Sequence, residues 1–337
     1  MKELTICICG GGSLGLVCAG VFASQGVKVN ILTGHPDSWS REISVEDMNG
    51  RRFEGSLNLV SGSARDAVGP ADIVLLCVPG YLIEKTLVNM RPYLKSDALV
   101  GSIVASTGFF FEAHKVLAPA TPLFGFQRVP YIARRKEYGR VGLLLGYKPQ
   151  LNVAIENVAD PQAVCQTLER LFMTPVNLLN NYYEASLTNS NPILHTGRLY
   201  AMWGNGFEPL PECSLFYAGW TDEASNYLIA MDAEFQTLLK VMGIREGIIP
   251  PLLEYYESSD AASLTRKIAS IPAFKSILAP MKETPEGWVP DFASRYFTED
   301  FPFGLSYIRD LAHEHGVPCP TIDLVYDWGR SVMTTEL

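Results

Sequence analysis

The sequence predicts an α/β protein in which a doubly wound parallel sheet is followed by a mainly α-helical domain. Three observations support this fold class. Short apolar runs of strand length alternate with amphipathic runs of helix length over roughly the first half of the 337 residues. A glycine-rich turn follows the first apolar run, and from about residue 183 long helical patterns replace the strand-like runs. We therefore place a first domain at residues 1–182 and a second at residues 183–337.

The elements of the first domain follow one another in order. Apolar runs that end at glycine or proline predict buried strands, and runs with helical periodicity predict the helices between them. Strands are expected at 3–10, 28–34, 71–79, 98–106, 140–147, 151–158 and 175–180. Helices are expected at 13–26, 81–94, 109–118 and 161–172, and in the second domain at 224–243, 261–271 and 304–316. We expect strands 140–147 and 151–158 to pair, and strand 175–180 to form an edge of the sheet.

The composition is typical of a well-packed globular protein. Hydrophobic residues make up 47% of the chain and charged residues 19%, which excludes a disordered or fibrous chain. The formal net charge is -9, so we expect no nucleic-acid partner, because such a surface needs clustered lysine and arginine. The one dense basic run, Arg134–Lys136, could hold a single small anion.

Nothing in the chain predicts a membrane partner. No apolar run is long and charge-free enough to span a bilayer, and the glycines between residues 10 and 20 do not suit a signal helix. The seven cysteines are scattered, several of them within apolar strands, which is typical of reduced core thiols rather than of a disulfide framework or a zinc site. We therefore expect a cytoplasmic protein with no metal site. The oligomeric state stays open, a homodimer included.

A glycine motif stands directly after the first predicted strand. In CGGGSLG, Gly10, Gly12 and Gly15 have the spacing G-x-G-x-x-G, with Ser13 and Leu14 opening the helix that follows. The first glycine allows a tight turn, the second lets a pyrophosphate approach the backbone, and the third lets the helix pack closely on the strand. The helix N-terminus supplies N–H groups and a partial positive charge. This context predicts a Rossmann domain that binds a dinucleotide.

The end of the second strand bears on which dinucleotide binds. NAD-specific sites usually carry Asp or Glu there, which bonds to the ribose hydroxyls. Thr33 stands at that position here, so no carboxylate at the strand end repels a 2′-phosphate, and Arg41 in the following loop could pair with one. Asp37 of the same loop would oppose the phosphate if it faced the site. Thr33 and Arg41 favour NADP over NAD, but NAD stays open, since Arg41 could equally be a solvated loop residue.

The stretch NPILH, residues 191–195, places one of the five histidines just after an Asn-Pro step. We expect Asn191 to cap a helix and Pro192 to begin it, where no backbone N–H is needed. His195 would then be held about one turn into the helix. Histidine titrates near neutral pH and therefore suits acid–base catalysis, whereas a partly buried structural histidine is the alternative.

A second polar stretch precedes a predicted helix. In SRYFTEDFPFGL, residues 294–305, Arg295 and Asp300 stand five residues apart. Together with NPILH, this stretch resembles the octopine/nopaline dehydrogenase family, the opine dehydrogenases. In that family an Asn-rich segment ending in His opens the helical domain, and R-Y-x-T-E-D-x-P-x-G-L follows later. The runs FGFQRVPYIAR and HGVPCPTID also fit, although Gln127 and Arg128 depart from the family pattern.

The resemblance implies roles for individual residues. It makes His195 the catalytic histidine and Asp300 its acidic partner. It places Arg295 against a substrate carboxylate and Asn191 in the substrate-binding segment. Residues 201–220 carry no signature of a particular amino acid, so the reaction class is implied more fully than the substrate.

The implied reaction joins the amine of an amino acid to a 2-oxo acid such as pyruvate, with loss of water and NAD(P)H-dependent reduction of the imine. Such a reaction needs a group that handles protons near neutral pH, as His195 could do. Two alternatives stay open. The chain could reduce a simple 2-oxo acid, in the manner of ketopantoate reductase or a 2-hydroxy acid dehydrogenase, or it could be a dinucleotide sensor without activity. A requirement for an amine separates the first alternative from opine synthesis.

Overall fold

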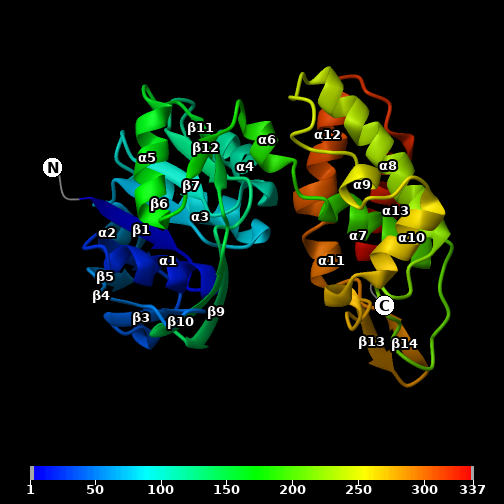
Figure 1. Ribbon diagram of the computed structural model, residues 1–337, viewed down its shortest axis with the longest axis horizontal. Coiled ribbons are helices and arrows are strands. Elements are labelled where there is room, and N and C mark those ends of the chain that lie inside the picture. The colour runs from blue at the N-terminus through cyan, green and yellow to red at the C-terminus, as the bar shows by residue number, and fades with distance from the viewer. Residues whose placement is uncertain (1–3, 335–337) are drawn as a thin grey trace. The chain divides into compact units, whose positions relative to one another are not determined.

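A computed structural model describes residues 4–334 of the chain (Figure 1). These residues form two compact units, with the boundary between Thr188 and Asn189. The first unit is α/β and the second is mainly helical, which confirms the predicted fold class. Each unit is described by itself.

The first unit is built on a sheet of eight strands in the order β12-β11-β8-β7-β6-β1-β2-β5. All neighbouring strands are parallel except β8 and β11, which are antiparallel. In sheet order, the strands are Val176–Leu178, Leu151–Glu156, Leu123–Phe126, Leu99–Ser102, Ile73–Leu76, Thr5–Cys9, Lys28–Leu32 and Leu59–Ser61. The predicted edge strand near residue 176 is confirmed as β12, at one end of this sheet.

A second sheet of four strands, in the order β4-β3-β10-β9, belongs to the same unit. Its strands are Arg52–Ser56, Glu42–Asp47, Val141–Tyr147 and Tyr131–Glu137. The expected pairing of residues 140–147 with residues 151–158 is therefore wrong. Strand β10 pairs with β9 and β3, whereas β11 crosses to the larger sheet and pairs with β8 and β12.

In the described part of this unit, five α-helices connect the strands and a sixth, α6, follows the last strand. They are α1 Ser13–Ala23, α2 Ala64–Val68, α3 Ile83–Met90, α4 Phe109–Val116, α5 Pro161–Phe172 and α6 Tyr182–Ser186. Helix α1 is buried along its length because it packs between β1 and β2 on one side and the four-stranded sheet on the other (Figure 1). A Cβ on Gly20 would lie 2.5 Å from Cγ2 of Val45, so a larger residue there would push the helix and the second sheet apart.

The second unit consists mainly of helices. They are α7 Asn191–Trp203, α8 Asp222–Val241, α9 Leu252–Tyr255, α10 Ala261–Ser270, α11 Arg295–Thr298, α12 Ser306–Glu314 and α13 Pro320–Met333, with a π-helical turn, η6, at Phe301–Leu305. The structure adds an antiparallel hairpin that the sequence analysis did not predict, formed by β13 (Met281–Thr284) and β14 (Gly287–Pro290). Its short strands are only partly buried, so their sequence lacks an apolar run.

Two further features of the fold concern cysteines and membranes. All seven cysteines are free thiols, and five of them are buried, as expected for core residues. Within residues 4–334, none of the helices combines the length and the apolar character that crossing a bilayer requires.

Candidate functional site

The glycine turn after β1 has the geometry that each glycine of the motif predicts. Gly10 has a φ of +119°, and a Cβ there would lie 2.5 Å from the carbonyl oxygen of Cys77. A Cβ on Gly15 would lie 2.1 Å from the carbonyl oxygen of Gly10, so helix α1 packs against the turn itself. A Cβ on Gly12 would meet no atom within 4 Å, so the space above this residue is open to a ligand. The turn therefore fits a pyrophosphate at the start of α1.

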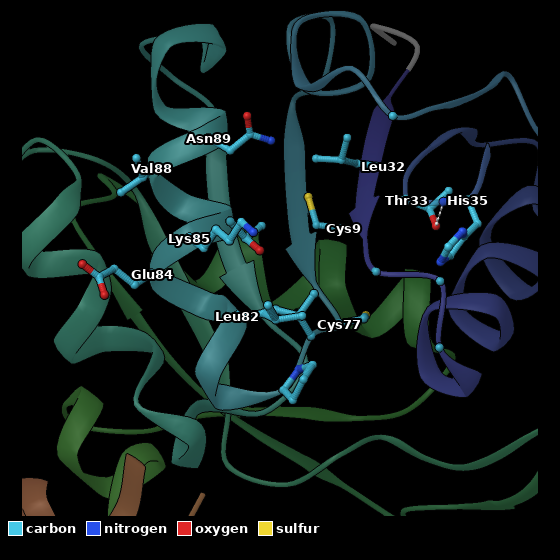
Figure 2. A pocket seen from close by; sticks show the side chains of 18 of the residues that line it. Cys9, Leu32, Thr33, His35, Cys77, Leu82, Glu84, Lys85, Val88 and Asn89 are labelled. Carbon is cyan, nitrogen blue, oxygen red and sulfur yellow. Dashed lines mark hydrogen bonds between the residues drawn. The ribbon is translucent and has the colours of Figure 1, made fainter. Parts of the chain in front are cut away.

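A cavity of about 1180 Å³ opens over this turn. A dinucleotide needs a volume of this order, since pockets for smaller ligands are typically about 300–1,000 Å³. Figure 2 shows Glu84, Lys85 and Asn89 of α3 on one side, with Thr33 and His35 on the other. The remaining lining residues come from α3 and the turn before it, from the ends of β1, β2, β5 and β6, and from β9 and the turn after it: Cys9, Gly10, Gly11, Gly12, Leu32, Gly34, Gly62, Cys77, Val78, Pro79, Leu82, Thr86, Val88, Arg135 and Tyr138.

The wall beside the end of β2 carries no carboxylate among the described lining residues. The side-chain oxygen of Thr33 accepts from the backbone N–H of His35 at 3.3 Å (Figure 2). Glu84, the acidic side chain among the described lining residues, lies on the opposite side. Arg135 also lines the cavity, with its guanidinium carbon 5.5 Å from the centre of the Tyr138 ring. The sequence analysis noticed the basic run but did not assign Arg135 to the dinucleotide.

Four of the cofactor residues expected from sequence do not line the cavity. Ser13, Leu14 and Gly15 lie in the first turn of α1, behind the glycine turn. Arg41 precedes β3, is exposed, and its carbonyl oxygen accepts from the backbone N–H of Leu57 at 2.8 Å. Their contact with a dinucleotide stays a prediction.

In the second unit, His195 lies in the second turn of α7. The expected cap is wrong: Asn191 is the first residue of the helix, Ser190 stands at the N-cap position, and no side chain there bonds to the free backbone N–H groups. Instead, the side-chain oxygen of Asn189 accepts from the backbone N–H of Asn191 at 3.2 Å. Pro192 is the second residue of the helix rather than the expected first, and it still lies in the first turn, where no backbone N–H is needed. His195 is therefore fixed on a regular helix, with 8% of its surface exposed.

Both ring nitrogens of His195 are hydrogen-bonded. Nδ1 lies 2.8 Å from Oδ2 of Asp300, and Nε2 lies 2.7 Å from the hydroxyl of Tyr217. A carboxylate can only accept, so Nδ1 carries the proton of the neutral ring and Nε2 accepts from the Tyr217 hydroxyl. Asp300 thus fixes the tautomer in which Nε2 can take up a proton. The structure brings together His195 and Asp300, which stand 105 positions apart in the sequence.

A close backbone approach places Asp300 beside α7. A Cβ on Gly304 would lie 2.5 Å from Cγ of Pro192, so only glycine lets η6 come this near to the start of α7. The backbone N–H of Leu305 donates to the carbonyl oxygen of Asp300 at 2.8 Å and closes the turn. The short helix α11 and the π-helical turn η6 precede α12, and neither was predicted from the sequence. The glycine of the FPFGL stretch therefore serves this contact.

Tyr217 was not predicted as a site residue, and a buried arginine holds its segment in place. Arg198 follows His195 by one helical turn and is 4% exposed. Its guanidinium donates to the carbonyl oxygens of Phe216 at 3.2 Å and Gly219 at 2.6 Å. Burial lowers the pKa of Arg198 to about 10, which leaves the group charged at neutral pH. Helix α7 thus positions both partners of the His195–Tyr217 bond.

Arg295 lies on the surface of α11. Its Nε and Nη2 donate to the two carboxylate oxygens of Glu299, each at 2.8 Å, and its side chain is 79% exposed. The Glu299 carboxylate thus already occupies the N–H edge of the guanidinium that a substrate carboxylate would use. The predicted contact of Arg295 with a substrate requires it to exchange Glu299 for the ligand.

Three potential metal ligands meet between α12 and α13. His313 Nε2 lies 3.0 Å from Asp323, and the thiol of Cys319 lies 3.7 Å from the same carboxylate. Arg309 already donates to Asp323 at 2.6 Å, and burial raises the pKa of the Cys319 thiol to about 11. A metal needs a thiolate and a free carboxylate oxygen, so this cluster fits a polar contact between two helices better than an ion site.

Both units match known families. Residues 178–333 match the family described as NAD/NADP octopine/nopaline dehydrogenase, alpha-helical domain, and residues 6–108 match the family described as ketopantoate reductase PanE/ApbA. The chain is 29% identical to the octopine dehydrogenase of Mizuhopecten yessoensis, over 97% of this chain and 89% of that protein. It is 28% identical to the tauropine dehydrogenase of Arabella iricolor, over 99% of this chain and 92% of that protein.

A solved structure has a similar fold. An octopine dehydrogenase in complex with NADH and L-arginine superposes with a TM-score of 0.84 at 27% identity, covering 98% of this chain and 89% of that one. The second unit therefore carries the α-helical domain of the octopine/nopaline dehydrogenase family, and the chain is similar over nearly its whole length to the NAD(P)-dependent oxidoreductases known as opine dehydrogenases.

Proposed function

We propose that this chain joins the amine of an amino acid to a 2-oxo acid such as pyruvate and reduces the resulting imine with NAD(P)H. The observation that carries the proposal is the bond between Nδ1 of His195 and Asp300, which leaves Nε2 as the basic nitrogen of the ring. Relatives support the substrate class, since octopine dehydrogenase has been solved with NADH and L-arginine and with NADH and pyruvate.

The residues of the second unit account for the proton transfers. His195 is the base that ends up with the proton given up by the amine, and Asp300 stabilises the imidazolium that results. The same proton then goes to the hydroxyl that leaves as water. Arg295 has the planar donors to orient the carboxylate of the oxo acid, and Asn191 belongs to the substrate-binding segment at the start of α7. A bound reduced nicotinamide supplies the hydride that completes the reaction.

Arg295→Lys tests the role of the arginine. Lysine keeps the charge but loses the two parallel hydrogen bonds to a carboxylate. We expect the KM for the oxo acid to rise by about tenfold or more, because two parallel bonds are worth at least ~1.4 kcal/mol more than a single one. The dissociation constant of the nicotinamide cofactor, measured by fluorescence, should not change. Glu299→Gln is the matched control, since it frees Arg295 from its carboxylate partner and should not raise this KM. If Arg295→Lys instead weakens cofactor binding, Arg295 contacts the cofactor rather than the oxo acid.

We also propose that the cavity prefers NADP over NAD. The support is the side chain at the end of β2, Thr33, which leaves a 2′-phosphate without a repelling carboxylate. Arg41 was the expected partner of that phosphate. Arg135 is the better placed of the two, because it lines the cavity and Arg41 does not.

Two arginine variants, Arg135→Ala and Arg41→Ala, form a matched pair for this preference. Arg135→Ala should weaken NADPH binding by about tenfold or more and leave NADH binding nearly unchanged, because only NADPH carries the phosphate. Arg41→Ala should have the smaller effect. Dissociation constants for both cofactors at one fixed salt concentration give the answer. A wild-type protein that binds NADH as tightly as NADPH contradicts the preference. If Arg135→Ala weakens the binding of both cofactors equally, the Arg135 side chain stacks on the adenine ring instead of pairing with the 2′-phosphate.

A second candidate function is the reduction of a simple 2-oxo acid, which the ketopantoate reductase match over residues 6–108 favours. A screen of amino acids against pyruvate, followed by cofactor absorbance, separates the two. Opine synthesis predicts that oxidation of NAD(P)H requires an amino acid. Equal rates with pyruvate alone would favour the second candidate.

A further inference from the structure

The bond between Tyr217 and His195 leaves the histidine ring with no open nitrogen. Each nitrogen of an imidazole has a single in-plane position for a proton or a lone pair. Asp300 occupies the position on Nδ1, and the Tyr217 hydroxyl occupies the one on Nε2 at 2.7 Å. A substrate therefore cannot bond directly to His195 while Tyr217 holds this place.

We propose that Tyr217 relays protons between the substrate and His195, so that its hydroxyl is the protein group that meets the reacting atoms. The inference rests on the function proposed above. The ammonium group of the amino acid gives a proton to the Tyr217 oxygen while the proton of Tyr217 moves to Nε2. The freed amine then forms the carbon–nitrogen bond with the carbonyl carbon, and a proton moves from nitrogen to the former carbonyl oxygen.

The second half of the sequence returns the proton along the same path. The proton held at Nε2 goes back to the Tyr217 oxygen, and the proton of Tyr217 goes to the new hydroxyl. The carbon–oxygen bond breaks, water leaves, and the protonated imine that remains accepts the hydride. Tyr217 and His195 end in their starting states.

A phenol suits such a relay because its oxygen accepts one hydrogen bond while its O–H donates another. Burial raises the pKa of Tyr217 well above its ordinary value, with the neighbouring Tyr296, Tyr256 and Asp300 acting in the same direction. The side chain therefore stays protonated at rest. It transfers protons between the substrate and His195 and does not itself act as a deprotonated base.

The ring of Tyr217 is held where a relay needs it. It stacks on Phe274, with ring centres 4.3 Å apart, and lies nearly parallel to Trp220, at 6.1 Å and 8°. Arg198 fixes the backbone on both sides of it through the carbonyl oxygens of Phe216 and Gly219. Reacting groups that are fixed in advance lose little entropy in the transition state, which is a general source of rate enhancement.

Tyr217→Phe tests the relay because it removes the hydroxyl and keeps the stacking. We expect the rate constant measured in single-turnover experiments to fall by about 10²-fold, the scale of lost acid–base assistance. The melting temperature and the dissociation constant of NADPH should stay close to the wild-type values. Tyr296→Phe is the matched control, because the Tyr296 ring packs 4.7 Å from the His195 ring while both ring nitrogens are bonded to other residues. Its loss should stay within about threefold.

Two results would overturn the relay. Turnover that survives in Tyr217→Phe means that the hydroxyl merely covers Nε2 and moves aside for the substrate. Equal losses in Tyr217→Phe and Tyr296→Phe mean that packing around the histidine matters rather than the bond to Nε2.

A proton inventory in mixtures of H₂O and D₂O gives a readout that a purely structural role would not move. A relay transfers two protons together, so the wild-type rate should depend on the deuterium fraction along a curve, and a straight line would contradict the relay. In a His195→Ala background, Tyr217→Phe should lower the rate little further, because the relay has already lost the histidine that accepts the proton. The wild-type requirement for an amine tests the proposed function separately. The Tyr217 and Tyr296 variants test the relay with whichever substrate the wild-type protein is found to reduce.

Discussion

His195→Ala is expected to lower turnover by about 10²-fold or more, the scale of a lost general acid–base group. The reason is geometric. His195 is fixed on α7, and its bond to Asp300 at 2.8 Å leaves Nε2 as the nitrogen that can accept a proton. No other histidine lies in contact with Asp300 among the described residues, so no neighbour can replace it. Steady-state kinetics with saturating amino acid and oxo acid measure the loss.

Asp300→Asn should also be severe, because the amide can donate to Nδ1 and hold the ring in the wrong tautomer. The double variant should be little worse than His195→Ala alone, since groups that act as a unit give strongly non-additive losses. Cofactor binding should survive in all three variants, because the glycine turn belongs to the other unit. Losses that simply multiply would mean that the two residues have independent roles.

Gly12→Ala is expected to abolish most of the cofactor affinity without loosening the fold. A Cβ at this position meets no protein atom within 4 Å, so the methyl group would occupy only the open space where we expect the pyrophosphate. We expect the dissociation constant of NADPH to rise by about tenfold or more, equivalent to ~1.4 kcal/mol. The melting temperature in the absence of cofactor should match the wild type.

Gly15→Ala is the matched comparison. Its Cβ would lie 2.1 Å from a backbone oxygen, so α1 must shift away from the turn. Overpacking of this kind costs about 1–3 kcal/mol, and the melting temperature should fall even without cofactor. If Gly12→Ala binds NADPH normally, the pyrophosphate does not lie over this turn.

The sequence predicted six of the eight strands of the larger sheet, because most of its strands are buried and therefore read as apolar runs. It missed β5 and β8, which have only three and four residues. The four-stranded sheet was missed for a different reason. Strands such as Glu42–Asp47 and Arg52–Ser56 bury alternate residues only, and charged residues interrupt their pattern. The expected pairing of residues 140–147 with residues 151–158 failed because neighbours in the sequence need not share a sheet. Strand β10 already has partners on both sides.

The site was predictable only in part. His195 and Asp300 could be joined in advance because the resemblance connected two distant stretches, whereas spacing alone relates residues within a single element. Tyr217 carried no such signal, since a tyrosine inside the apolar run SLFYAGW is ordinarily a core residue. Its partner depends on how Arg198 holds the segment against α7, which is a tertiary contact. Likewise, Arg135 reaches the cavity only because the second sheet lies beside the glycine turn.

The most direct test of the proposed reaction is the mass of its product. Incubation of the purified chain with NAD(P)H, pyruvate and a ¹⁵N-labelled amino acid should yield a secondary amine that retains the label. Its mass should equal that of the amino acid plus pyruvate less one oxygen atom, because one water is lost and two hydrogens are gained. Lactate as the product of every amino acid tested, with the labelled amino acid recovered unchanged, would contradict opine synthesis.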